Sequence, residues 1–232
     1  MQRGEDRCIW QGLEGRRGVL RMTDQLSSNV QSGSTSAIAE AYPQYTRKEV
    51  IADGIMHVLG IFGSITAFTT IYIYAFQSLP APLNFALVIY GISVIALFVF
   101  SASYHLTPYT EHKPFLRLCD QSAIFVKIAG SYTPIVVIIG TPLAYTLLAL
   151  IWSGAIVGSV SEFAKHEMLD RHTVLVFLAM GWASLLLVWP MFNTMETQDA
   201  LLIVLGGLVY SVGVFFYQWE GLKFQNAIWH AF

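Results

Sequence analysis

The feature that most constrains the fold is a series of long apolar stretches. A membrane-spanning helix needs about 20 mostly apolar residues, whereas a spanning β-strand needs only about ten, with alternating polarity. The stretches in this chain do not alternate, and they lie at residues 50–76, 83–106, 119–139, 142–162, 172–192 and 198–217. They predict six transmembrane helices, because lipid cannot hydrogen-bond the backbone and only helices or closed barrels satisfy it internally.

The charge content supports this prediction. Only 12% of the 232 residues are charged and 55% are hydrophobic, whereas about 25% of the residues of a typical soluble domain are charged. Such a chain lacks the polar surface needed to face water on all sides. Its net charge of −2 provides no large basic field, so nucleic acid is not an expected partner. Membrane lipid is the expected partner, because the apolar surface of the chain must face it.

The two ends of the chain differ from its apolar middle. Residues 1–49 are rich in Arg and Ser and have no apolar core of a signal peptide, so we expect a disordered cytoplasmic tail before a transmembrane domain at residues 50–232. A further helix is predicted to begin near Gln225, but the residues up to Phe232 reach only about 12 Å. The expected fold is therefore all-α, a multi-pass transmembrane helical bundle with six complete spans and the start of a seventh.

The loops between the predicted spans indicate their direction. Every second connection contains Lys or Arg, and the connections between them contain neither. The basic residues next to or between the spans are Arg47, Lys48, Lys113, Arg117, Lys165, Arg171 and Lys223. By the positive-inside rule, the N-terminus and these basic loops lie in the cytoplasm.

Ionisable side chains collect at the cytoplasmic ends of four predicted spans. These residues are Asp53, His57, His105, Asp120 and His230. Such side chains are costly inside a membrane and therefore mark a candidate functional site. Imidazole and carboxylate groups are ordinary zinc ligands, and Ser101, one helical turn before His105, can orient a ligand or a water molecule. Taken singly, Ser101 is more often a packing residue and His105 an interface residue, so the hypothesis rests on the cluster.

The segments around these residues resemble the hemolysin III family, the bacterial branch of the progestin and adipoQ receptor (PAQR) family. The resemblance covers about residues 45–232 and rests on residues 52–57, 101–105, 118–134, 180–182, 206–213 and 227–230. It implies a seven-span protein of the bacterial inner (plasma) membrane with a cytoplasmic N-terminus. It also implies a zinc site near the cytoplasmic face.

In that family, a Ser-x-x-x-His motif in the second span supplies one zinc ligand and a His-x-x-x-His motif in the seventh supplies two. An Asp in the third span holds the zinc-bound water. The resemblance thus implies that His105 and His230 are zinc ligands, that Ser101 supports His105, and that Asp120 is the water-holding carboxylate.

The chain departs from the family pattern at two places. The first histidine of the seventh-span pair falls at Asn226, and an amide is a poor zinc ligand. Two routes can supply a third ligand: Asp120 binds the metal directly, or His57 contributes from the first span. The family's last span also continues beyond the position of Phe232, so the chain resembles a member truncated in this span.

Three functions stay open at this point. The first is a zinc-dependent membrane hydrolase of a lipid amide or ester, with Asp120 as general base. The second is a cytolysin, or hemolysin, as the family name implies, although the nearly apolar outer halves of the spans argue against a conducting pore. The third is a non-enzymatic receptor or membrane-homeostasis factor that binds a lipid or a metal, which Asn226 favours over robust catalysis.

Overall fold

The computed structural model describes residues 45–76, 78–108, 110–165, 171–219 and 221–232. These residues are helical apart from short connections, and no strand occurs among them. The helices form a compact unit made of Tyr45–Thr107 and Lys113–Phe232. The all-α prediction is confirmed, whereas most of the predicted tail lies outside the described residues, which begin at Tyr45.

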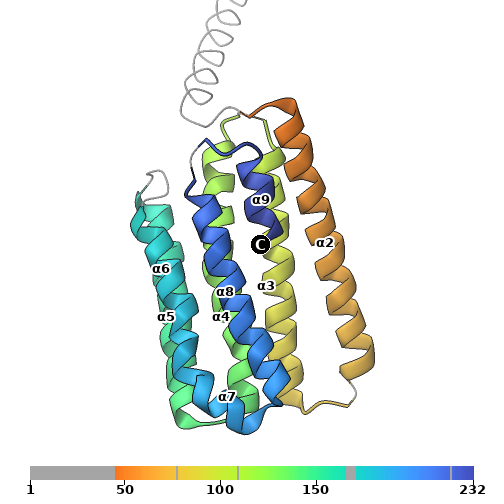
Figure 1. The fold of residues 1–232 in the computed structure, drawn as a ribbon, viewed down its shortest axis with the longest axis vertical. Helices are drawn as coiled ribbons and strands as arrows, with labels where there is room; N and C mark the ends of the chain where they lie inside the picture. Colours follow the sequence, from red (N-terminus) through yellow and green to blue (C-terminus); the bar gives the residue numbers. More distant parts are fainter. Residues whose placement is uncertain (1–44, 77, 109, 166–170, 220) are drawn as a thin grey trace, which may run out of the picture. The chain divides into compact units, whose positions relative to one another are not determined.

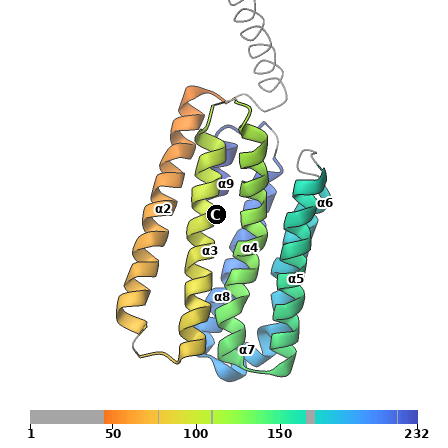
Figure 2. The ribbon, with the colours of Figure 1, turned by 180° about the vertical axis from the view of Figure 1, so that it is seen from behind.

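Within the described residues, six helical segments are long and apolar enough to cross a membrane (Figures 1 and 2). Four are continuous helices: α2 (Arg47–Ala75), α3 (Ala81–Leu106), α4 (Lys113–Ile139) and α5 (Pro142–Lys165). The fifth comprises α6 (Arg171–Trp182), the 3-10 helix η1 (Ala183–Leu187) and α7 (Val188–Thr194), and the sixth is α8 (Thr197–Tyr217). The shorter helix α9 (Gln225–Ala231) follows. The prediction of six spans and a short seventh helix is confirmed.

The first span begins slightly earlier than the apolar pattern indicated, because polar residues form its first turn. The backbone N–H of Glu49 donates to Thr46 Oγ1 at 3.4 Å, and the backbone N–H of Thr46 donates to Glu49 Oε2 at 2.9 Å. This reciprocal capping box satisfies two N–H groups that a helix start otherwise leaves without partners. It starts α2 at Arg47 rather than at residue 50.

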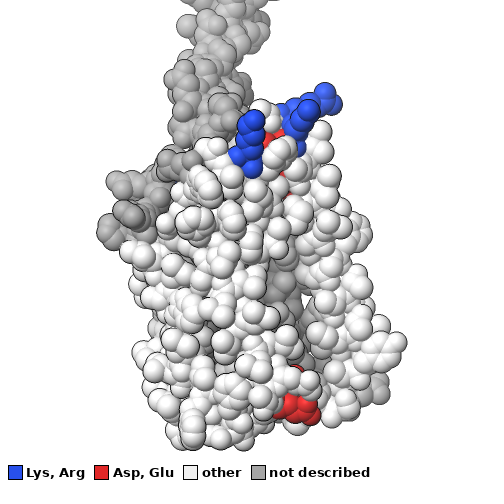
Figure 3. Space-filling model, viewed as in Figure 1, with Lys and Arg blue, Asp and Glu red and all other residues white. Residues whose placement is uncertain are grey.

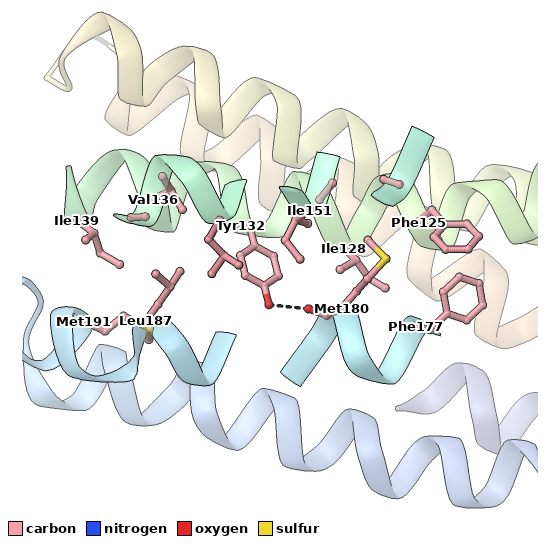
Figure 4. Packing of buried hydrophobic residues seen from close by; sticks show 14 of the residues in the cluster. Phe125, Ile128, Tyr132, Val136, Ile139, Ile151, Phe177, Met180, Leu187 and Met191 are labelled. Carbon is pink, nitrogen blue, oxygen red and sulfur yellow. Dashed lines mark hydrogen bonds between the residues drawn. The ribbon is translucent and has the colours of Figure 1, made fainter. Parts of the chain in front are cut away.

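Helix α4 is the central helix of the bundle. Half of the residues in an apolar 18-residue stretch of α4 are buried inside the protein. In the corresponding stretch of α2, a peripheral helix, only 11% are buried. One side of α4 packs against α3, and another against α5. Its buried side chains Phe125, Tyr132 and Val136 form a hydrophobic core with residues of α5, α6 and α7 (Figure 4). This core lies along the middle of the bundle and holds α4 in a fixed position.

The predicted span at residues 172–192 is confirmed, but it is not α-helical throughout. Five residues, Ala183–Leu187, form a 3-10 helix. Pro190 lies just beyond them, and a proline has no N–H to donate and crowds the turn before it, which explains the tighter winding. The Tyr132 hydroxyl donates to the carbonyl oxygen of Met180 at 2.6 Å, next to this irregular segment (Figure 4).

On the face seen in Figure 3, charged side chains gather at the two ends of the bundle. Lys and Arg are visible at one end only, with some acidic surface among them, an acidic patch lies at the other end, and uncharged residues lie between. Helices α2, α4 and α9 begin at the first of these ends and α3 finishes there (Figure 1). We refer to it as the basic end. The candidate site lies near the basic end, because its Asp and His residues lie close to the ends of these four helices that meet there.

Candidate metal centre

Helix α2 contributes Asp53 and His57, which lie one turn apart on its buried face. Only 5% of Asp53 and 1% of His57 are exposed. The Nδ1 atom of His57 lies 2.8 Å from the backbone carbonyl oxygen of Asp53. A carbonyl oxygen can only accept a hydrogen bond, so Nδ1 carries the proton and Nε2 of the neutral ring keeps its lone pair. That Nε2 atom lies 3.1 Å from Ser101 Oγ.

Helix α9 brings His230 to the same place. Its Nδ1 atom donates to Asp53 Oδ1 at 2.7 Å, and its Nε2 atom lies 3.3 Å from Ser101 Oγ. A carboxylate that accepts from one imidazole nitrogen fixes the ring and leaves the other nitrogen available, as is usual for metal-binding histidines. Asp53 therefore orients both rings, through its side chain for His230 and through its backbone for His57.

Ser101 is placed between two imidazole nitrogens that both face it. A hydroxyl has one proton, so Ser101 can donate to only one of the two Nε2 atoms. The other nitrogen then presents its lone pair to an oxygen lone pair inside a buried cluster. A divalent cation or an additional proton between these atoms relieves this repulsion, so the arrangement fits a cation-binding site.

His105 and Asp120 complete the cluster from α3 and α4. The Nδ1 atom of His105 lies 3.4 Å from Asp53 Oδ2, and its Nε2 atom lies 3.9 Å from Asp120 Oδ2. The amide nitrogen of Asn226 lies 3.3 Å from His105 Nδ1. The ring centroid of His105 is 4.8 Å from that of His230 and 5.4 Å from that of His57. Three imidazoles and two carboxylates thus meet within one small volume.

A buried lysine anchors the end of α3 that carries His105. The ammonium group of Lys113, which is 6% exposed, donates to the carbonyl oxygens of Tyr104 and Thr107, the latter at 2.9 Å. The last carbonyls of a helix lack intrahelical partners, and a cation satisfies them favourably. Lys113 therefore holds the final turn of α3, and with it His105, against the start of α4.

The structure brings all the residues proposed from the sequence close together, but only some of them belong to the group that could hold a metal. Ser101, His105, Asp120 and His230 lie together, and Asn226 contacts His105. Among the described residues, one group that could hold a metal differs from the set that the resemblance implies. One ligand atom from each of Asp53, His57 and His230 lies within 4.8 Å of the others. His105 and Asp120 stand beside this group rather than within it.

Asp53 is the residue whose role the sequence interpretation missed. The sequence pattern places it in the candidate cluster but assigns it no specific role. The available signal was its spacing from His57, since residues four apart share a helix face and present side chains to one site. What the spacing did not reveal is the partner, His230, which is 177 positions away in the chain.

A pocket leads from the surface of the basic end to this cluster. Its walls come from the first turns of α2 and α9, and its inner lining includes Asp53, His105 and Asn226. Two members of the cluster, Asp53 and His105, therefore line a pocket near the basic end.

Six apolar helical segments around a buried Asp–His cluster define a class: a multi-pass helical membrane protein with a polar site near one membrane face. Residues 45–232 match the sequence profile described as "Haemolysin-III related". The chain belongs to this family, and the match covers the whole helical unit.

Curated relatives agree with this assignment. The chain is 37% identical over 190 residues to "Hemolysin-3 homolog" of Bacillus subtilis (strain 168), covering 81% of this chain and 89% of that protein. It is 35% identical over 186 residues to "Hemolysin-3" of Bacillus cereus, covering 80% and 85%. It is 32% identical over 185 residues to human "Monocyte to macrophage differentiation factor", covering 69% and 75%. No solved structure matches the chain significantly.

Proposed function

We propose that this protein is a zinc-dependent membrane hydrolase that cleaves an amide or ester bond of a lipid. The observation that carries the proposal is the convergence of His57 Nε2 and His230 Nε2 on the single hydroxyl of Ser101, with the Asp53 carboxylate beside them. Imidazole is an ordinary zinc ligand, and a carboxylate that accepts from the far nitrogen of the ring is its usual partner. Of the two routes for replacing the ligand at Asn226, this arrangement favours the one through His57.

Each residue of the cluster would have a separate chemical role. His57 and His230 would hold the metal through their Nε2 atoms, while Asp53 fixes both rings from the Nδ1 side. The metal would supply a Lewis acid for polarising a carbonyl group and for making water a better nucleophile. Asp120 is the carboxylate within reach of the cluster that is not committed to orienting a ring, so it would accept the proton of the attacking water. Ser101 would orient the water or the substrate carbonyl with its hydroxyl.

The position of the cluster indicates how a substrate reaches it. The pocket is lined by the first turns of α2 and α9, at the basic end. We infer that this end faces the cytoplasm of a bacterium, with the protein in the inner membrane, because the Lys and Arg residues of the chain lie in alternate connections. A lipid headgroup with its amide or ester bond at the membrane surface is then the substrate class that meets the site.

The test is metal content combined with turnover. We expect the purified full chain, reconstituted in nanodiscs, to hold about one zinc per chain, and His57→Ala and His230→Ala to hold much less. Zinc-loaded protein should release fatty acid from a short-chain fluorescent ceramide or ester, and chelation should stop the reaction. Metal binding by the wild type without any release of fatty acid would reject the hydrolase.

A non-enzymatic role is the second candidate, and Asn226 is the observation that favours it. An amide replaces a histidine of the family motif and contacts His105 instead of supplying an imidazole. A site with fewer strong ligands suits a receptor or a membrane-homeostasis factor that responds to metal or lipid without turnover. Metal-dependent changes in lipid binding with no product would identify this role.

The name of the Bacillus cereus relative also raises a cytolytic role for this chain. The distribution of polar groups gives it little support, since a conducting path needs polar side chains along the full depth of a span. Here they concentrate near the basic end. Leakage of a dye from liposomes that contain the purified protein would establish it.

A further inference from the structure

Helix α9 begins without the usual stabilising features. Its first flanking residue, Phe224, has a left-handed backbone with φ of 60° and ψ of 26°, a conformation that bulky residues rarely adopt. No side chain of its own caps the helix, and the helix is only seven residues long. Short helices are marginal without tertiary support. The position of His230, near the other end of α9, therefore depends on contacts with neighbouring helices.

One of these contacts is a hydrogen bond to α2. The backbone N–H of Phe224 donates to Glu49 Oε1 at 3.1 Å, although the residues are 175 positions apart. The other carboxylate oxygen, Oε2, accepts from the backbone N–H of Thr46 at 2.9 Å and from the Thr46 hydroxyl at 2.7 Å. A single carboxylate thus joins the starts of two helices, and bonds to an ionised acceptor are stronger than neutral ones.

Glu49 also shares a helix face with the cluster. Glu49, Asp53 and His57 are spaced four residues apart and follow one side of α2. Two polar connections therefore link α2 to α9: Glu49 to Phe224 at the surface, and Asp53 to His230 in the interior. Because they lie about one turn apart along α2, together they fix how far α9 is shifted and rotated relative to α2.

We propose that Glu49 is a positioning residue of the metal centre: it fastens the start of α9 to α2 and so places His230 against Asp53. This inference rests on the proposed metal site. It assigns to Glu49 no contact with metal or substrate. The competing account is that Glu49 only caps α2, in which case its loss weakens the first turn of α2 and leaves α9 in place.

Three variants separate the two accounts. Glu49→Ala removes the bond to Phe224 and the bonds to Thr46. Thr46→Ala removes the capping partner on α2 and leaves the Glu49 carboxylate free to accept from Phe224, so it is the matched control. Glu49→Gln keeps an amide oxygen that can accept from Phe224 N–H, so it tests rescue by a conservative change.

The first measurement is metal affinity, with Zn²⁺ by competition titration and Co²⁺ by its visible absorption spectrum, on the full chain in nanodiscs. We expect Glu49→Ala to weaken binding by about 10- to 100-fold, as typical for residues that orient ligands, and to alter the Co²⁺ spectrum. Thr46→Ala and Glu49→Gln should stay within a few-fold of the wild type. Unchanged affinity and spectrum in Glu49→Ala would overturn the proposal.

The second measurement, hydrogen exchange of metal-free protein, does not depend on the proposed function. We expect Glu49→Ala to speed exchange of the amides of Gln225–Ala231, and Thr46→Ala to speed only those in the first turn of α2. If the wild type binds neither metal, the metal site fails, and faster exchange in α9 still supports the fastening role of Glu49. If exchange in α9 is unchanged in Glu49→Ala, the fastening role itself is wrong.

Discussion

The imidazole of His230 donates a hydrogen bond of 2.7 Å to the carboxylate of Asp53, and this bond joins the first transmembrane helix to the last helix of the chain. The same carboxylate lies 3.4 Å from His105 Nδ1 through its second oxygen. Asp53 is therefore the residue that two histidines from different helices share. Its negative charge also makes the cluster more favourable for a divalent cation.

Replacing Asp53 with Asn should show whether that charge matters. The amide oxygen of Asp53→Asn can still accept from His230, but it is uncharged. We expect zinc affinity to fall by about 10- to 100-fold, the usual effect of weakening a group that orients metal ligands. The matched control is Asp199→Asn, an exposed carboxylate in the first turn of α8. Equal affinities of the two variants in a competition titration would argue against any role of Asp53 at the metal site.

The ligand set can be decided at Asn226 and His57. If His57 and His230 hold the metal, Asn226→His changes zinc affinity by less than about tenfold, and His57→Ala lowers it by more than about 100-fold. The reason is that Asn226 faces His105, at 3.3 Å, and is not a member of the group around Ser101. Strong tightening by Asn226→His, with no effect of His57→Ala, would instead restore His105 and His230 as the main ligands.

The sequence predicted the layer of the site but not its internal contacts. Loop charges and hydropathy placed Ser101, His105, Asp120 and His230 near one membrane face, because span direction and residue depth follow from local patterns. The bond between Asp53 and His230 depends on how α9 packs against α2, and no local pattern contains that information. The motif resemblance directed attention to Asn226 and so left Asp53 without a role.

A similar limit applies to the fold. Hydropathy identified the apolar segment at residues 172–192, but it is insensitive to helix pitch, so it did not predict the 3-10 helix at Ala183–Leu187. The early start of α2 was missed for a related reason. Thr46 and Glu49 stabilise the first turn with polar groups, and an analysis based on apolar runs discards such residues.

The direction of the chain in the membrane can be tested with single cysteines. In a background with Cys8 and Cys119 replaced by Ser, we expect Ser78→Cys, between α2 and α3, to react with an impermeant maleimide on intact cells. Lys223→Cys, between α8 and α9, should react only after lysis, since the basic connections are expected in the cytoplasm. The reverse pattern would move the candidate site to the outer face of the membrane.

The packing of α5 against α4 gives a prediction with an internal control. Gly158 and Gly154 lie one turn apart on α5, but their surroundings differ. A Cβ atom at Gly158 would lie 2.4 Å from the ring of Phe125, whereas at Gly154 the nearest atoms, of Met180, would be 3.8 Å away. Phe125 is only 2% exposed and packs on Phe177 with ring centroids 4.5 Å apart, so its ring has little room to retreat.

Gly158→Ala should therefore destabilise the bundle by about 1–3 kcal/mol, the usual cost of overpacking a core. Gly154→Ala makes only an ordinary contact and removes a flexible residue from a helix, so it should be neutral or stabilising by about 0.5–1 kcal/mol. Unfolding free energies of the two variants in mixed detergent micelles provide the comparison. Equal stability of the two variants would mean that Phe125 can move aside, and that the core around α4 is looser than its burial implies.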